Sequence, residues 1–88
     1  MILGDVLLNY MTWEEAKSAE KDGWRLPTLE ELKELYITSK DKFGNYGCWS
    51  STKYDDVHYW SLGFHTGNTY INPKNNLNYV RLVKTSLP

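Results

Sequence analysis

Cysteine and long apolar runs are scarce in this chain of 88 residues, and each shortage excludes a class of protein. The single cysteine, Cys48, cannot form an intrachain disulfide, and no cysteine-based zinc site can be assembled around one thiolate. No apolar stretch approaches the length that crosses a bilayer, and residues 1–10 lack the basic start and cleavage site of a secretory signal. We therefore expect a cytoplasmic protein with no membrane partner.

An excess of charge of one sign is also missing. The formal net charge is −1, so electrostatics give no reason to expect binding to nucleic acid or to an acidic membrane surface. Aromatic residues, in contrast, are plentiful: four Trp, seven Tyr and two Phe. Buried aromatic rings remove much surface from water, which helps a short chain to fold. We expect residues 1–88 to form a single domain.

Two copies of one helix-start signal are the clearest local feature. Glu15 follows Thr12 by three residues, and Glu31 follows Thr28 by three. In each pair the hydroxyl can accept from the backbone N–H of the Glu, while the carboxylate reaches back to the N–H of the Thr. These capping boxes predict the starts of two helices.

The predicted helices are short. The first covers residues 13–21 and stops at Gly23, which can adopt the left-handed conformation that ends helices. Residues 24–27 are predicted to be extended, because Pro27 disfavours helical geometry in the residue before it. The second helix ends before residue 38. One of its faces is apolar and consists of Leu29, Leu32, Leu35 and Tyr36.

After residue 43 the pattern changes to alternation and turn residues. The clearest element there is a hairpin in which residues 65–68 turn the chain between two strands. A first strand is predicted over residues 2–8 and ends near Asn9. The other predicted strands cover residues 48–51, 59–64, 69–71 and 79–84. Residues 54–57 and 72–76 are predicted loops. The fold class is therefore α+β, with two short helices packed on a small antiparallel sheet with long loops.

Residues suited to catalysis or metal binding are few. Asp55, Asp56 and His58 form one tight group, but a calcium site needs about six or more oxygens and a zinc site about three or four ligands. We interpret the group as a solvated loop. His65, in the predicted turn, has no neighbour at a spacing that would orient it as a base. We predict no catalytic residue, no metal and no cofactor, and do not expect an enzyme.

A second set of residues is predicted to hold the fold. It comprises two helix caps, three core tryptophans and the two arginines of the chain: Thr12, Thr28, Trp24, Trp49, Trp60, Arg25 and Arg81. Cys48, beside a core tryptophan, is interpreted as a small buried apolar residue. The arginines are predicted to brace loops by donating to backbone carbonyls or to a carboxylate such as Glu31, with plain surface arginines as the alternative.

The second half of the chain has the composition of a recognition surface. Six of the seven Asn and eight of the thirteen aromatic residues lie after Gly44. Tyr offers a large contact area at a small entropic cost and Asn adapts its hydrogen bonds, although small β-domains use similar residues in turns. We place the predicted surface on residues 54–59 and 67–78. Its candidate contact residues are Tyr54, Asp55, Tyr59, Asn68, Tyr70, Asn72, Asn75 and Asn76.

Several short motifs occur in an order that points to a family. They are Thr12 to Ala16, Gly23 to Glu31 (which begins Gly-Trp-Arg-Leu-Pro-Thr), Trp-Ser-Ser-Thr (49–52), Tyr59-Trp60 with Phe64 and Gly67, and Tyr79-Val80-Arg81. Together they resemble the bacterial Lcl C-terminal domain family, which is C-type-lectin-like. The resemblance implies a compact scaffold whose irregular loops present a binding surface. The chain is similar to the free-standing members found in phage and prophage genomes.

Composition and resemblance lead to one expected function and two alternatives. We expect a non-enzymatic protein-binding module, a phage or prophage accessory protein that docks on and modulates a host protein in the host cytoplasm. The first alternative is a carbohydrate-binding domain. It would not depend on calcium, because the chain lacks the Glu-Pro-Asn and Trp-Asn-Asp signatures of sugar-binding C-type lectins. The second alternative is a structural or self-associating virion component.

Overall fold

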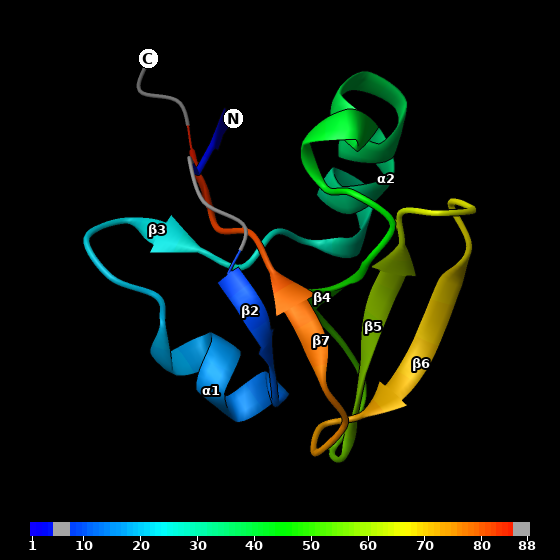
Figure 1. Ribbon diagram of the computed structural model, residues 1–88. Helices are drawn as coiled ribbons and strands as arrows, with labels where there is room; N and C mark the ends of the chain where they lie inside the picture. The colour runs from blue at the N-terminus through cyan, green and yellow to red at the C-terminus, as the bar shows by residue number, and fades with distance from the viewer. Residues whose placement is uncertain (5–7, 86–88) are drawn as a thin grey trace.

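Two helices and two sheets make up this small α+β domain (Figure 1). The computed structural model describes residues 1–4 and 8–85. The elements are β1 (Ile2–Leu3), β2 (Leu8–Met11), α1 (Trp13–Ser18), β3 (Trp24–Arg25), α2 (Leu29–Ser39), the 3-10 helix η1 (Lys40–Lys42), β4 (Gly47–Asp55), β5 (His58–Gly63), β6 (Thr69–Pro73), β7 (Asn78–Val80) and β8 (Val83–Lys84). Among the described residues, no helix has the length and apolar character needed to span a membrane.

Both helices begin where the capping boxes predict. The Thr12 hydroxyl accepts a hydrogen bond from the Glu15 N–H (3.3 Å), and the Glu15 carboxylate accepts one from the Thr12 N–H (2.9 Å). The same two bonds join Thr28 and Glu31, at 3.1 and 2.9 Å. Each box satisfies N–H groups that have no partner inside the helix, and the predicted starts are confirmed.

The first helix ends earlier than predicted, at Ser18 rather than near residue 21. The backbones of Lys21 and Trp24 bond to each other in both directions and close a tight turn. The two central residues of this turn, Asp22 and Gly23, have φ of 55° and 86°. A right-handed helix has negative φ throughout, so the helix must stop before this turn.

The second helix is longer than predicted. It continues through the polar residues to Ser39, and η1 extends it by a further turn. The Thr38 hydroxyl donates to the Glu34 carbonyl (3.1 Å), so this polar side chain is satisfied within the helix and does not end it. The predicted apolar face is confirmed by the burial of Leu29, Leu32 and Leu35.

The larger sheet has the strand order β2-β7-β4-β5-β6 and curls into a five-stranded half-barrel. Its neighbouring strands are antiparallel, except that β4 and β7 are parallel. The curl is strong enough for the side-chain amide of Asn78 in β7 to donate to Asn72 in β6 (3.2 Å), although two strands separate them in the sheet. The half-barrel therefore has one strongly concave side.

Two predicted loops belong partly to strands. β4 runs to Asp55, so Tyr54 lies in a strand and only residues 56–57 turn the chain into β5. β6 likewise includes Asn72 and Pro73. The hairpin formed by β4 and β5 was not predicted from the sequence. The pairing of these strands shifts register after Trp49, which interrupts the alternation of apolar and polar residues that marks a strand. The predicted turn over residues 65–68 is confirmed between β5 and β6.

The predicted closing strand over residues 79–84 is broken in two. β7 ends at Val80 and pairs with β2 and β4, whereas β8 pairs with β1 and β3 in a separate three-stranded sheet of order β1-β8-β3. Residues 78–84 thus contribute one strand to each of the two sheets. The predicted first strand corresponds to β1 and the start of β2; Asp5, Val6 and Leu7, which belong to that prediction, lie outside the described residues.

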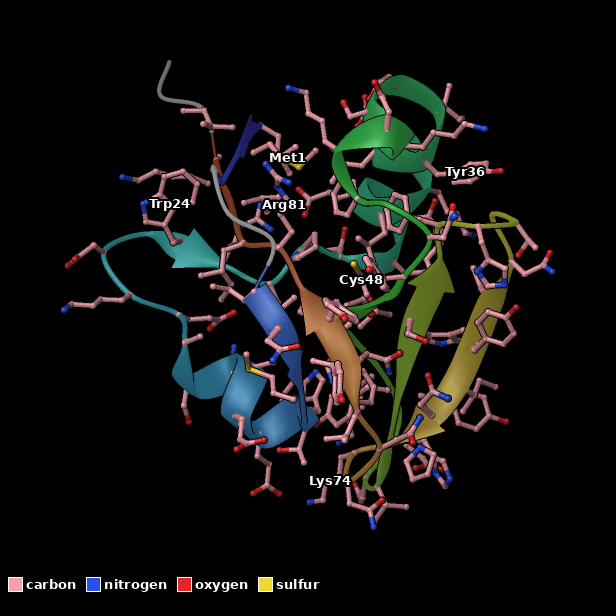
Figure 2. All side chains as sticks on the ribbon, in the orientation of Figure 1. Met1, Trp24, Tyr36, Cys48, Lys74 and Arg81 are labelled. Carbon is pink, nitrogen blue, oxygen red and sulfur yellow. The ribbon has the colours of Figure 1, made fainter. Side chains whose placement is uncertain are left out.

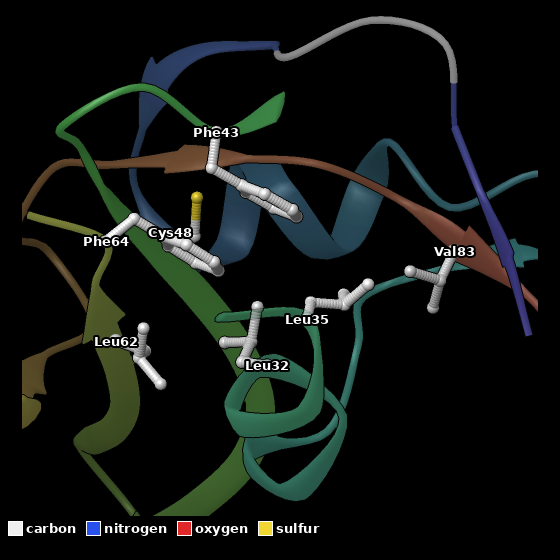
Figure 3. Close-up of a cluster of buried hydrophobic side chains, with 7 residues drawn as sticks. All are labelled: Leu32, Leu35, Phe43, Cys48, Leu62, Phe64 and Val83. Atoms are coloured by element: carbon white, nitrogen blue, oxygen red, sulfur yellow. The ribbon is translucent and has the colours of Figure 1, made fainter. Parts of the chain in front are cut away.

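One core lies between the half-barrel and α2. Cys48 and Leu62, on neighbouring strands, pack with Leu32 of α2 (Figure 3). Phe43 stacks on Phe64 in the same cluster, with 4.0 Å between ring centroids. We call this side of the sheet the α2 face.

The opposite side, which we call the α1 face, is built around Trp49. This residue is fully buried with Ala16 of α1, and its indole N–H donates to the Met11 carbonyl (2.8 Å). The predicted core position is thus confirmed for Trp49. It is wrong for Trp24 and Trp60, which are half-buried. Trp24 lies in the three-stranded sheet and is not a member of either core. Trp60 lies in the first half of β5, close to the β4–β5 turn.

Candidate binding surface

The predicted contact residues lie on β4, β5, β6 and the connections between them, at one side of the half-barrel (Figure 1). Tyr54 and Asp55 end β4, Tyr59 lies in β5, Asn68 precedes β6, Tyr70 and Asn72 lie in β6, and Asn75 and Asn76 follow it. The structure therefore gathers segments that are up to 22 positions apart in the chain. They do not form one surface, however, because successive side chains of a strand point to opposite faces.

Tyr54 belongs to the α2 face. Its ring stands nearly perpendicular to the rings of Trp60 and His58, two alternate residues of β5, with 5.9 and 6.4 Å between ring centroids. Ile71 of β6 lies opposite Trp60 and shares this face. α2 covers only the end of the sheet that is distant from the β4–β5 turn (Figure 1). Tyr54 and Ile71 therefore stay 56% and 39% exposed. We call Tyr54, Trp60 and Ile71 the apolar patch.

Tyr59, Tyr70 and Asn72 belong to the α1 face. Tyr59 stacks on Trp13 of α1, with 3.7 Å between ring centroids and 10° between ring planes. The side-chain oxygen of Asn72 accepts from the Ser61 hydroxyl of β5 and from the side-chain amide of Asn78 in β7. Tyr59 and Asn72 therefore make internal contacts that hold the half-barrel, whereas Tyr70 is 41% exposed.

Asp55 shapes the turn between β4 and β5. One of its oxygens accepts from the Val57 N–H (2.9 Å) and lies 2.8 Å from Nδ1 of His58. These bonds, first of all that from Val57, favour the charged carboxylate and lower the pKa of Asp55 below its usual value. Asp56 pairs instead with Lys53 (2.9 Å). In the described part of the chain, no three His, Cys, Asp or Glu side chains come together as a metal site requires.

A shallow cavity of about 190 Å³ lies where the loop after β6 meets the start of α1. It is lined by Thr12, Glu14, Lys74 and Asn75. Lys74 ties the two segments together, since its carbonyl accepts from the Trp13 N–H (3.0 Å) and its ammonium lies 3.4 Å from Glu14. Pockets that hold small molecules usually measure about 300–1,000 Å³, so this cavity is small for such a ligand.

Arg25 makes the carboxylate contact that the sequence predicts. Its guanidinium donates to both carboxylate oxygens of Glu31, at 2.7 and 2.9 Å, and to the Thr85 hydroxyl at 3.1 Å. The hydrogen bonds from Arg25 lower the pKa of Glu31 from 4.5 to about 2, although partial burial acts in the opposite direction. Since Glu31 also caps α2, this pair joins β3 to the start of that helix.

Arg81 makes the predicted contacts with backbone carbonyls. Its Nε donates to the Gly4 carbonyl (2.7 Å) and its Nη1 donates to the Lys42 carbonyl (2.6 Å), and the guanidinium lies 5.7 Å from the centre of the Phe43 ring. Figure 2 shows Arg81 among the side chains near the N-terminal strand, at the break between β7 and β8. This side chain connects three segments that are distant in sequence.

A stack of three tyrosines was not predicted from the sequence. Tyr46 stacks on Tyr79 with 4.1 Å between ring centroids, and the rings of Tyr10 and Tyr79 meet at a steep angle with 5.4 Å between centroids. Tyr10 and Tyr46 are exposed. The three rings come from β2, β7 and the segment before β4, which become neighbours only through the strand order of the sheet. No pattern in the sequence links these positions.

The family of the chain follows from its sequence match to a known domain. The Lcl C-terminal domain matches residues 7–84, nearly the whole length. The chain therefore belongs to the Lcl C-terminal domain family, in agreement with the resemblance seen in its motifs. No curated protein matches the chain in sequence.

Proposed function

We propose that this domain is a non-enzymatic protein-binding module that uses the apolar patch as a contact surface. The observation that carries the proposal is the exposure of Tyr54 and Ile71 beside Trp60, on a face whose other end packs against α2. Exposed apolar side chains that cluster together often mark interaction sites, and aromatic residues commonly dominate their binding energy. A sheet also holds such side chains in fixed positions, which lowers the entropic cost of binding.

The chemistry of other side chains supports binding over catalysis. Cys48 is buried, and burial raises the pKa of its thiol to about 12, so almost no thiolate is present at neutral pH. Asp55 and His58 bond to each other within a turn, where they serve the local backbone structure. The apolar patch itself contains no ionisable group apart from the Tyr54 phenol.

The proposal extends to the finer fold and to the origin of the protein. We assign the domain to the C-type-lectin-like folds, an assignment supported by two helices beside two sheets and by the pairing of the first strand with the last. We further propose a phage or prophage accessory protein that modulates a host protein in the host cytoplasm. This last part rests on the family resemblance alone.

Quantitative pull-down from a host lysate tests the binding role. Tyr54→Ala truncates an exposed side chain, so we expect an intact fold and capture of the main partner reduced at least about tenfold, as for a hot-spot residue. Glu30→Lys, a charge reversal on the exposed side of α2, is the matched control and should leave capture unchanged. Circular dichroism checks that each variant keeps the fold of the parent. If Glu30→Lys abolishes capture and Tyr54→Ala does not, the site lies elsewhere.

A second candidate function is calcium-independent carbohydrate binding, which the tyrosine stack favours. Tyr10 and Tyr46 expose ring surface beside phenolic hydroxyls, a combination of apolar and polar atoms that suits a sugar ring. A glycan array probed with the parent domain separates the two functions. Specific glycan binding that persists in the Tyr54→Ala variant would favour this candidate over protein docking.

A further inference from the structure

β6 is an edge strand of unusual composition. It comes last in the five-stranded sheet, and no other described strand pairs with its outer side (Figure 1). Edge strands usually carry charges or other features that hinder pairing with another chain. β6 reads Thr-Tyr-Ile-Asn-Pro and carries no charge, and Tyr70 and Ile71 are exposed near its centre. Apart from the proline at its end, nothing in β6 hinders addition of another strand.

Hydrogen bonds on either side of β6 show which of its backbone groups point outward. The Gly63 N–H donates to the Asn68 carbonyl (2.9 Å) just before the strand, and the Lys74 N–H donates to the Val57 carbonyl (2.8 Å) just after it. In an antiparallel pair, every second residue directs both backbone groups to the partner strand. Both bonds involve even-numbered residues of this segment, so the even positions face β5 and the odd positions face outward.

We propose that two copies of the chain pair antiparallel through β6 in a two-fold symmetric dimer. In the register centred on Tyr70, Thr69 of each copy lies opposite Ile71 of the other, and the two residues exchange both backbone hydrogen bonds. This pairing satisfies every outward N–H and C=O of Thr69 and Ile71. A register centred on Ile71 would place Thr69 opposite Pro73, which has no N–H to donate. The Thr69 carbonyl would then lack a donor, whereas the register centred on Tyr70 leaves Pro73 outside the pairs of Thr69 with Ile71.

The side chains at this edge also fit a second copy. Tyr70 meets its symmetry mate in a non-hydrogen-bonded pair, in which the Cα atoms are about 4.5 Å apart and aromatic rings stabilise each other. On the other face, Ile71 lies beside Thr69 of the second copy and extends the apolar patch across the symmetry axis. Because β6 has no charge, no like charges of this strand oppose each other. The dimer is closed, since each copy uses its β6 edge once.

Sedimentation velocity over a range of concentrations tests for the dimer without any other partner, so its outcome is independent of the pull-down. We expect a monomer–dimer equilibrium for the parent and its loss in Ile71→Lys, which places two like charges close to the symmetry axis. Ile37→Lys makes the same change at an 82% exposed site of α2 and should leave the dimer intact. A parent that stays monomeric up to about 1 mM, or a dimer that survives Ile71→Lys, overturns the proposal.

Amide hydrogen exchange measured by NMR locates the interface in the parent. The N–H groups of Thr69 and Ile71 become hydrogen-bonded in the dimer, so we expect their exchange to slow at least about tenfold between dilute and concentrated samples. The Tyr70 N–H already faces β5 and should change little. If the chain dimerises while Thr69 and Ile71 exchange at the same rate in both samples, the copies meet at another surface and the proposal is wrong.

Discussion

Replacing Glu31 with glutamine separates two roles of one carboxylate. Glu31 accepts from the Thr28 N–H at the start of α2 and pairs with two nitrogens of Arg25. Glutamine keeps a side-chain oxygen for the cap but removes the charge. The expected result of Glu31→Gln is therefore a loss of unfolding free energy that depends on pH.

The size of this loss follows from the pKa of Glu31, which the Arg25 hydrogen bonds lower from 4.5 to about 2. At about 1.36 kcal/mol per pKa unit, the difference corresponds to about 3 kcal/mol, to which the Arg25 hydrogen bonds contribute most and the hydrogen bonds from Thr28 a smaller part. The Glu31 side chain is 24% exposed, so screening by solvent reduces the expected value to about 2 kcal/mol at pH 7. Because the folded-state pKa is the lower one, the stabilisation is present above a pH of about 4.5 and is lost as the pH falls toward about 2.

Urea denaturation of parent and variant between pH 7 and about pH 3 measures this loss, and more than half of it should be gone at about pH 3. Glu15→Gln is the matched control, because Glu15 forms the same capping box with Thr12 and neither arginine contacts it. At pH 7 the loss of unfolding free energy from Glu15→Gln should be smaller than that from Glu31→Gln. A loss from Glu31→Gln that is equal at both pH values, or no larger than that from Glu15→Gln, would refute the role of the ion pair.

Two further substitutions test the core and a tight backbone contact. Trp49→Ala removes a fully buried ring and leaves the Met11 carbonyl without its indole donor, so urea denaturation should show a loss of about 3–5 kcal/mol; a variant as stable as the parent would place the ring outside the core. Gly67→Ala adds a Cβ that would lie 2.7 Å from the Tyr36 ring at a residue with φ of 81°, and should cost more than about 1 kcal/mol. An unchanged melting temperature for Gly67→Ala would show that this contact relaxes freely.

The helix starts could be predicted because their signal is local. Each capping box spans four residues, and the apolar face of α2 follows from spacing within one element. The helix ends depend on what comes next. α1 stops for the tight turn between Lys21 and Trp24, and α2 continues because the Thr38 hydroxyl bonds inside the helix. Neither effect is visible in residue type alone.

Strand boundaries depend on partners that are distant in sequence. β4 was predicted too short because its register shifts against β5 break the alternation that marks a strand. Residues 79–84 have the pattern of one strand, yet β7 and β8 pair in different sheets. Arg81 lies between them and takes carbonyl partners 77 and 39 positions away in the chain. Such pairings are set by the whole fold.

The region of the candidate surface could be predicted from composition, but the orientation of its side chains could not. Tyr54 and Tyr70 come from the same part of the sheet and lie on opposite faces, while Tyr59 and Asn72 make internal contacts. The strand register decides these directions, and a shift of one residue would reverse them. The same reasoning explains why the tyrosine stack, drawn from three separate segments, was not predicted.

The pairing of β1 with β8 determines how the domain would respond to mechanical tension. Ile2 lies opposite Lys84 and Leu3 opposite Val83, so the chain enters and leaves the small sheet at the same end (Figure 1). A force that pulls these ends apart opens the short ladder one pair at a time instead of loading all its hydrogen bonds together. The bond from the Gly4 N–H to the Leu82 carbonyl (2.8 Å) and the bond from Arg81 to the Gly4 carbonyl are then the next to bear load. The first strand would peel away at low force, and this would uncover Val83, the residue through which the small sheet contributes to the core on the α2 face.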